Sequence, residues 1–226
     1  MGYGKMGRLV EQLAPGYGFE VRLRLDVRDN PHGQGLTRQN LEGVHVAVEF
    51  SMPEAAPENA QRLAALGVNT VVGTTGWFER LAEVRAAVEQ HGTGLVWGAN
   101  FSVGVNLFLQ IVGRAASLFA EERSYDAWGW EIHHAAKKDA LSGTLLRLAE
   151  EMKKNGYGRP ISLSATRAGA HPGTHEIGFD SPADTITLRH TARSREGFAR
   201  GALRAAAWLV GKKGFYEFGE IVGQLD

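Results

Sequence analysis

The stretch Gly2-Tyr-Gly-Lys-Met-Gly7 follows the pattern G-x-G-x-x-G and leads into a helix-compatible segment, Arg8 to Ala14. Glycines in this pattern allow a tight turn and bring backbone amides close to a pyrophosphate, which the N-terminus of the following helix attracts. An acid that bonds a ribose hydroxyl is expected about 20 residues later, and Asp26 stands near that spacing. The stretch therefore predicts a Rossmann-like, dinucleotide-binding domain.

Strand and helix signals alternate along the first half of the chain. We expect strands at 19–25, 44–48, 69–72 and 95–97, and helices at 53–66 and 78–90. Such alternation favours a parallel sheet with right-handed crossovers. The glycine motif normally follows a strand, whereas this sequence opens at Met1. We therefore expect the sheet to lack its first, central strand, which would leave neighbouring strand edges open.

The pattern changes after about residue 103. The second half predicts a long apolar helix near 103–121, a strand within 125–133, a helix over 143–155, strands near 160–167, 173–180 and 184–191, and a last helix over 195–210. Strands without intervening helices are typical of an α+β domain. The predicted fold class is α/β: a Rossmann-like doubly wound parallel sheet, formed by 1–103 plus 195–226, with an inserted α+β domain at 104–194.

Composition limits the function classes. The chain has 226 residues, with 25 Lys and Arg against 25 Asp and Glu, so no whole-protein field favours nucleic acid or an anionic membrane. The absence of cysteine excludes disulfides and cysteine-ligated metal. No apolar run reaches the roughly 18 residues of a membrane span. We expect a cytoplasmic protein with neither nucleic-acid nor membrane partners.

A second informative stretch, Glu131 to Thr144, reads EIHHAAKKDALSGT. Trp128, Trp130 and Ile132 alternate with polar residues just before and within it, as in a half-buried strand. His133 and His134 are neighbours on that strand and would face opposite sides, so they are poorly placed to share a metal ion. No metal site is predicted.

Ser142 is expected to cap the next helix. The free amides of Gly143 and Thr144 would then suit a carboxylate. Lys137 and the two histidines precede this cap, and donor groups that converge in this way predict an anionic substrate and a proton donor. A solvated loop with an ordinary cap is the competing interpretation.

Two short turns, Gly73-Thr-Thr-Gly76 and Gly98-Ala-Asn-Phe101, each follow a predicted strand, where doubly wound sheets bind ligands. The predicted cofactor-binding residues are Gly2, Gly4, Lys5, Met6, Asp26, Gly73, Thr74, Thr75, Gly98, Ala99, Asn100 and Phe101.

Taken together, these segments resemble the dihydrodipicolinate reductase family, whose signature matches Glu131 to Thr144. The resemblance extends to Glu49-Phe-Ser51, Gly73 to Gly76, Asn100 to Asn106, Arg167-x-Gly169 and Gly173-x-His175. It implies reduction of a small cyclic dicarboxylate, 4-hydroxy-tetrahydrodipicolinate, by NADH or NADPH in the synthesis of lysine and diaminopimelate. It also implies that the inserted domain binds substrate and assembles a homotetramer.

The resemblance further implies roles for individual residues. His133 and Lys137 would transfer protons, while His134, Lys137, Ser142, Gly143 and Thr144 would hold a substrate carboxylate. Asp26 would repel a 2′-phosphate, so the sequence leans toward NADH, although Arg28 could reach such a phosphate. Two alternatives stay open: a different amino-acid or imino-acid dehydrogenase of the same two-domain build, and a non-catalytic nucleotide-binding sensor.

Overall fold

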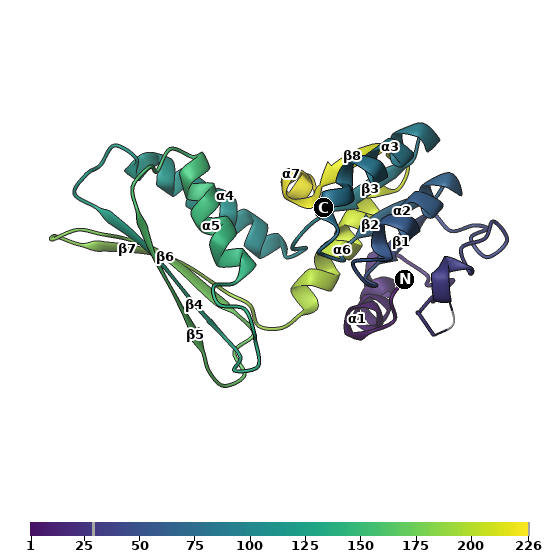
Figure 1. Cartoon of the computed structure of the whole chain (residues 1–226), viewed down its shortest axis with the longest axis horizontal. Coiled ribbons are helices and arrows are strands. Elements are labelled where there is room, and N and C mark those ends of the chain that lie inside the picture. Colours follow the sequence, from purple (N-terminus) through teal and green to yellow (C-terminus); the bar gives the residue numbers. More distant parts are fainter. Residues whose placement is uncertain (29, 226) are drawn as a thin grey trace. The chain divides into compact units, whose positions relative to one another are not determined.

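The structure is a computed structural model that describes residues 1–28 and 30–225 (Figure 1). The chain divides into two compact units, one formed by Met1–Val103 with Glu196–Asp226 and the other by Gly104–Arg195. The first unit is therefore discontinuous in sequence, and the second lies between its two parts. Among the described residues, no helix combines the length and the apolar character needed to cross a membrane.

The first unit contains a four-stranded parallel sheet in the order β1-β2-β3-β8. Its strands are β1 (Val46–Glu49), β2 (Asn69–Val72), β3 (Gly94–Trp97) and β8 (Gly214–Glu217). Its helices are α1 (Lys5–Leu13), α2 (Ala56–Ala65), α3 (Leu81–His91), α6 (Glu196–Leu209) and the short α7 (Phe218–Ile221). The helix predicted over 195–210 corresponds to α6, which is part of the first unit, whereas β8 and α7 have no counterpart in the sequence predictions.

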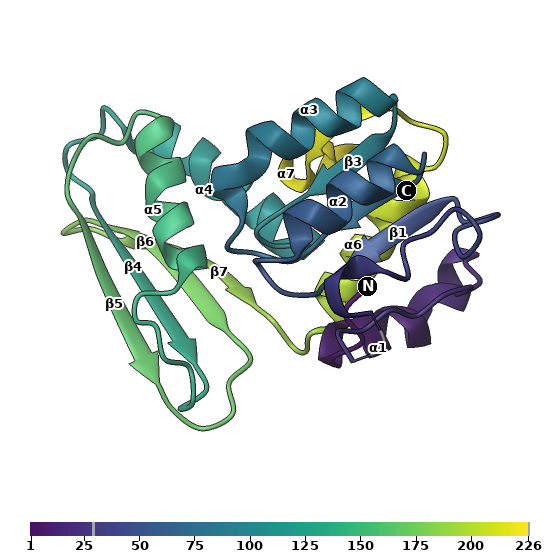
Figure 2. The ribbon, with the colours of Figure 1, turned by 45° about the vertical axis from the view of Figure 1, so that its right-hand side comes forward.

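Helices cover both faces of this sheet, because alternate strand residues point in opposite directions. Val71 and Val96 pack with α6 in one apolar cluster, while their neighbours Val72 and Leu95 pack with α2 and α3 in another. Figure 2 shows α2 and α3 beside each other in front of the strands. The predicted doubly wound α/β fold with a parallel sheet is confirmed.

The strand predicted at 19–25 is wrong, because this segment is extended but belongs to no strand. A strand requires a ladder of hydrogen bonds to a neighbouring strand, whereas this segment meets the neighbouring chain where the Leu25 carbonyl accepts from the Gly2 amide, at 2.9 Å. On its other side, Met1 donates to the Val48 carbonyl at 2.7 Å and accepts from the Phe50 amide at 2.9 Å. Met1 and Gly2 thus bridge residue 25 and the end of β1.

The second unit is an α+β arrangement built on a mixed sheet in the order β5-β4-β6-β7. Its strands are β4 (Asp126–His133), β5 (Ile161–Arg167), β6 (Thr174–Asp180) and β7 (Thr185–Thr191), and its helices are α4 (Val103–Phe119) and α5 (Gly143–Lys154). β4 is parallel to β5 and antiparallel to β6. Its register sets Glu131 opposite His175 on β6, and His133 opposite Arg167 on β5.

The two faces of β4 differ in a way that hydrophobicity alone does not predict. Ala127, Gly129, Glu131 and His133 point to the buried face, whereas Trp128, Trp130 and Ile132 are only half-buried. Gly129 explains which face of β4 is buried, because a Cβ there would lie 3.1 Å from a methyl group of Leu145 on α5. The helices pack closely on the small residues, so the polar Glu131 and His133 become buried beneath them.

Candidate functional site

The glycine loop before α1 is held by close backbone contacts. A Cβ on Gly2 would lie 2.2 Å from the Phe50 carbonyl oxygen, and one on Gly7 would lie 2.1 Å from the Gly2 carbonyl oxygen. A Cβ on Gly4, the N-cap of α1, would meet nothing within 4 Å. The outer two glycines thus fix the turn, and Gly4 leaves open space before the first amides of α1, those of Lys5 and Met6. This geometry fits a phosphate group.

Asp26 lies beside this loop, because the preceding residue, Leu25, accepts the hydrogen bond from Gly2. Its carboxylate accepts a hydrogen bond from the Val27 amide at 2.8 Å. The structure therefore brings Asp26 to the glycine motif even though the segment leading to it is not a strand.

The Gly73–Gly76 turn is tied to β1 by a buried carboxylate. Glu49, which is fully buried, accepts hydrogen bonds from the Thr74 hydroxyl at 2.5 Å and from the Ser51 amide at 3.1 Å. A Cβ on Gly73 would lie 2.1 Å from the ring of Phe50. Glu49 thus orders the carboxyl ends of β1 and β2 together, a role that its place in the sequence did not reveal. Thr75 lies between these anchored positions.

The Gly98–Phe101 turn follows β3. The Asn100 side chain accepts from the Ser102 amide at 2.8 Å, which closes the turn. Phe101 is buried, and its ring centroid lies 4.6 Å from that of Phe218. Its side chain therefore belongs to the core, so Phe101 could offer a cofactor only its backbone atoms. Gly98 and Ala99 precede it in the same turn.

The second unit holds a buried polar cluster centred on Glu131, which has no exposed surface. One carboxylate oxygen accepts from the Ser142 amide at 2.9 Å and from the Arg167 guanidinium at 2.6 Å. The other accepts from the Ser142 hydroxyl and lies 3.3 Å from Nε2 of His175. Burial alone would raise the pKa of Glu131, but the hydrogen bonds from Ser142 and Arg167 outweigh it and lower this pKa. Glu131 is therefore an anion bound on several sides.

His133 and His175 form the second part of the cluster. Their ring centroids are 5.0 Å apart at 72°, and Nδ1 of His133 lies 3.7 Å from the Glu131 carboxylate. Burial lowers the pKa of His133, with Lys137 and Arg167 adding to the effect and Glu131 opposing it. Burial, together with His133, lowers the pKa of His175 to about 4. Both imidazoles are thus neutral near pH 7.

Glu131, His133 and His175 offer ligand atoms within 4.8 Å of one another, a spacing that a metal ion could use. Both oxygens of Glu131 already accept hydrogen bonds from Ser142 or Arg167. The cluster is therefore better described as a hydrogen-bond network than as a metal site.

Lys137 lies in the loop between β4 and α5. Its ammonium is 2.7 Å from the Asp139 carboxylate, and this contact lowers the pKa of Asp139. The Lys137 amide donates to the His134 carbonyl at 3.0 Å, which forms a turn. Arg167 holds the same loop through the Asp139 carbonyl. His134 itself follows the end of β4 and is half-buried.

Ser142 caps α5, as predicted, by accepting from the Leu145 amide at 3.3 Å. It is also buried, and both its amide and its hydroxyl are bonded to Glu131. This arrangement favours a role in holding the helix start rather than in touching substrate. Gly143 is exposed and Thr144 is half-buried, so their amides remain the accessible ones.

Sequence reasoning assigned no role to three residues of this network: Glu131, Arg167 and His175. Each stood within a quoted motif, but α5 and most of β5 separate the motif of Glu131 from those of Arg167 and His175. Only the register of β4 with its two neighbours places these side chains together. The local pattern held no such signal for Glu131, because its alternation with Trp130 and Ile132 places it on the face expected to be polar.

Comparisons with known proteins agree across both units. The family described as "Dihydrodipicolinate reductase, N-terminus" matches residues 1–101, and "Dihydrodipicolinate reductase, C-terminus" matches residues 104–222. A protein of Christiangramia forsetii named 4-hydroxy-tetrahydrodipicolinate reductase is 31% identical over 236 residues, which cover 100% of this chain and 97% of that protein. A protein of the same name from Methanosarcina mazei is 37% identical over 194 residues, covering 79% of this chain and 73% of that protein.

A solved structure shares the fold. Dipicolinate-bound dihydrodipicolinate reductase from Paenisporosarcina sp. TG-14 matches with a TM-score of 0.77 and 22% identity, over 96% of each chain.

Proposed function

The chain belongs to the dihydrodipicolinate reductase family, and from this we infer that it reduces 4-hydroxy-tetrahydrodipicolinate to tetrahydrodipicolinate with NADH or NADPH. This reaction belongs to the synthesis of lysine and diaminopimelate. The observation that carries the assignment is the match of both halves of the chain to one family, together with a charged cluster before a capped helix start in the second unit.

The first unit would hold the cofactor. The open space at Gly4 and the first amides of α1 suit a pyrophosphate, and Asp26 suits a ribose hydroxyl. The turns at Gly73–Thr75 and Gly98–Phe101 would line the nicotinamide side, because they follow the carboxyl ends of β2 and β3. A bound nicotinamide supplies the hydride, so the protein's own task is to orient the substrate and handle protons.

The second unit would hold the dicarboxylate. The amides of Gly143 and Thr144 stand at the positive end of α5 and would donate hydrogen bonds to one carboxylate, with His134 and Lys137 nearby in sequence. Lys137 and His133 would provide the proton that the reduced ring system requires. Because burial keeps the pKa of His133 low, its proton is released readily once the imidazolium forms.

We also propose that the protein forms a homotetramer and that it is located in the cytoplasm. The support for assembly is the half-buried face of Trp128, Trp130 and Ile132, since a strand face with large apolar side chains suits contact with another copy. Light scattering coupled to size-exclusion chromatography would measure the mass, and a monomer at micromolar concentration would contradict the tetramer.

A coupled assay tests the reaction. Dihydrodipicolinate synthase makes the labile substrate from pyruvate and aspartate semialdehyde, and the loss of reduced-nicotinamide absorbance is followed. Substrate-dependent oxidation of NADH or NADPH supports the proposal. A folded chain that binds the cofactor but leaves it unoxidised would favour a non-catalytic sensor.

A further inference from the structure

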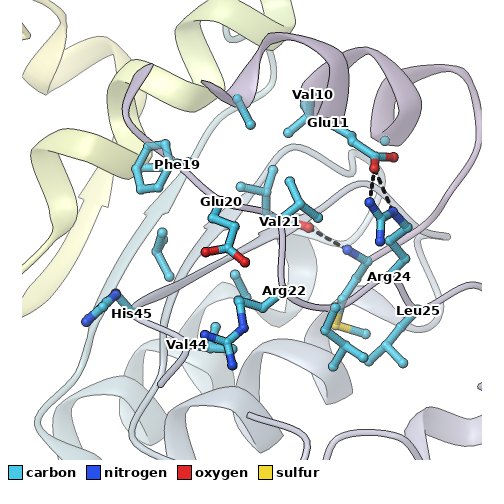
Figure 3. Close-up of a pocket in the computed structure, with 18 of the residues that line it drawn as sticks. Val10, Glu11, Phe19, Glu20, Val21, Arg22, Arg24, Leu25, Val44 and His45 are labelled. Atoms are coloured by element: carbon cyan, nitrogen blue, oxygen red, sulfur yellow. Dashed lines mark hydrogen bonds and ion pairs between the residues drawn. The ribbon is translucent and has the colours of Figure 1, made fainter. Parts of the chain in front are cut away.

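Two ion pairs of the chain differ in their exposure to water. Arg24 and Glu11, which line the cavity of about 370 Å³ drawn in Figure 3, keep 49% and 25% of their side chains exposed. Arg167 and Glu131 in the second unit keep 16% and 0%. A buried ion pair is often no more stabilising than well-packed apolar residues of similar volume. Stability alone therefore does not explain why a charged pair lies at the centre of the second unit.

Glu131 holds Ser142 at two points. The Ser142 amide donates to one carboxylate oxygen at 2.9 Å, and the Ser142 hydroxyl donates to the other. The Arg167 guanidinium donates to the first oxygen at 2.6 Å. The carboxylate is thus bound on both of its oxygens, and the residue that it holds most closely is the one that precedes α5.

Ser142 in turn sets where α5 begins. Its hydroxyl accepts from the Leu145 amide at 3.3 Å and so caps the helix. The geometry of a first helical turn gives the amides of Gly143 and Thr144 no partner within the helix. Because Ser142 is attached by both its backbone and its side chain, the direction of these two amides is fixed by the same carboxylate.

The carboxylate of Glu131 is also connected to Lys137, through Arg167. The guanidinium that pairs with Glu131 donates from Nε to the Asp139 carbonyl at 3.1 Å. The Asp139 carboxylate lies 2.7 Å from the Lys137 ammonium. A guanidinium can hold two acceptors at fixed angles, which an ammonium on a flexible stem does not. The loop before α5 is therefore attached to Glu131 through both Asp139 and Ser142.

We propose that Glu131 is a positioning residue, which aims the amides of Gly143 and Thr144 at a carboxylate of the substrate. Through Arg167 it also holds the loop that carries Lys137. Glu131 has no exposed surface, so it acts on the substrate only through these groups. Donors that are already in place bind an anion without a cost of ordering them. The inference rests on the proposed function for the identity of the substrate.

Titration calorimetry of the full chain with dipicolinate, a ring that carries two carboxylates, tests this role. Glu131→Asp keeps the negative charge but withdraws the carboxylate by roughly 1.5 Å, the length of one carbon–carbon bond. We expect the Kd for dipicolinate to rise about tenfold, as for the loss of one hydrogen bond to a charged group, and the Kd for NADH to stay unchanged. Leu148→Ala, on the buried face of α5, is the control for lost stability and should leave both Kd values nearly unchanged.

A second pair of variants asks whether Glu131 acts through the helix start. Gly143 is the first residue of α5, where proline is tolerated, and a Cβ there would meet nothing within 4 Å. Gly143→Pro removes one amide donor and should raise the Kd for dipicolinate about tenfold, whereas Gly143→Ala keeps the donor and should change it little. Combining Gly143→Pro with Glu131→Asp should raise the Kd by less than the product of the two single effects, because one donor that Glu131 aims is gone.

Arg167→Lys keeps the charge beside Glu131 but loses the second attachment to Asp139, and it provides the test if Glu131→Asp does not fold. We expect a smaller rise in the Kd for dipicolinate than with Glu131→Asp. Unchanged dipicolinate binding in these variants would overturn the proposal, as would no binding by the unsubstituted chain.

Two further outcomes would also overturn the positioning role. If Leu148→Ala weakens dipicolinate binding as much as Glu131→Asp, lost stability explains the effect. If the double variant shows the full product of the single effects, Glu131 and the Gly143 amide act independently. Dipicolinate binding with the expected pattern, in a chain that does not reduce 4-hydroxy-tetrahydrodipicolinate, would support the positioning role and refute the proposed reaction.

Discussion

Gly173 lies against the imidazole of His133, so closely that a Cβ on Gly173 would be 2.9 Å from Nε2 of that ring. Gly173 also has a φ of +138°, which favours glycine. For Gly173→Ala we therefore expect the ring to shift and kcat/KM to fall by about tenfold or more, because misplacing a catalytic group by about 1 Å costs that much. Steady-state kinetics in the coupled assay would measure it.

The control for this change is Gly169→Ala, at φ +52°, where the nearest atom to a new Cβ is 3.9 Å away. It also places a side chain at a positive φ, at a smaller strain than at Gly173, and does not touch His133. Equal losses of activity in the two variants would mean that strain alone, and not the position of the ring, explains the effect.

Glu131→Gln removes the charge at the centre of the buried cluster and leaves Arg167 without its anionic partner. Breaking a buried pair on one side costs several kcal/mol, so we expect the free energy of unfolding to fall by about 3 kcal/mol. Urea denaturation measures this change. Glu150→Gln is the control, since Glu150 and its partner Lys154 are 62% and 64% exposed, and the loss there should stay below about 1 kcal/mol. If both losses are equally small, the cluster does not stabilise the fold.

Stability should depend on pH through His175, whose pKa is lowered from 6.5 to about 4 by burial and by His133. Between these values the unfolded chain binds more protons than the folded chain, so the free energy of unfolding falls as pH falls from about 6.5 to about 4. The full effect of this group is roughly 3 kcal/mol. His175→Gln should flatten the profile over that range, measured by urea unfolding at several pH values. If the variant's free energy of unfolding depends on pH as steeply as that of the unsubstituted chain, groups other than His175 cause the dependence.

Lys137→Ala should abolish most turnover while leaving cofactor binding intact, because Lys137 belongs to the second unit. A lost proton-transfer group lowers kcat/KM by about 10²- to 10⁴-fold. Lys138→Ala, the exposed neighbour, provides the control and should retain activity. NADH binding measured by fluorescence separates a catalytic defect from a folding defect, and similar activities in both variants would contradict the assigned role.

Because of Asp26, we expect the protein to prefer NADH to NADPH. Its carboxylate stands beside the glycine loop and would repel a 2′-phosphate, so the KM for NADH should be lower than that for NADPH. Asp26→Asn should reduce the difference between the KM values for NADH and NADPH. A lower KM for NADPH in the unsubstituted chain would show that a cation such as Arg28 governs the site instead.

The sequence predicted most elements of the fold because their hydrophobic periods are regular. The strand over 69–72 and the cap at Ser142 match the structure, and α4, α5 and α6 lie within a few residues of their expected ranges. The segment 19–25 also has a regular alternation, but a strand depends on neighbours that a local pattern does not report. The short β8 was missed because Gly214–Glu217 alternates too briefly to be distinguished from a loop.

For the candidate site, the sequence supplied the groups but not their partners. His133 and Lys137 stand in one motif, whereas the contacts that fix Glu131 come from Ser142, Arg167 and His175 on three other elements. Which face of β4 becomes buried was decided by Gly129 and the close approach of α5. Long-range packing of this kind cannot be inferred from spacing along one strand.

Because the first unit is discontinuous in sequence, its two parts leave the ribosome at different times during synthesis. Its sheet includes Gly214–Glu217 beside Gly94–Trp97, so a nascent chain cannot complete it until Gly214–Glu217 has left the ribosome. Residues 104–195 form a continuous unit and emerge earlier. Because domains generally fold as units during synthesis, we expect the unit that carries His133 to fold first and the glycine-loop unit to be completed last, when its C-terminal segment returns to it.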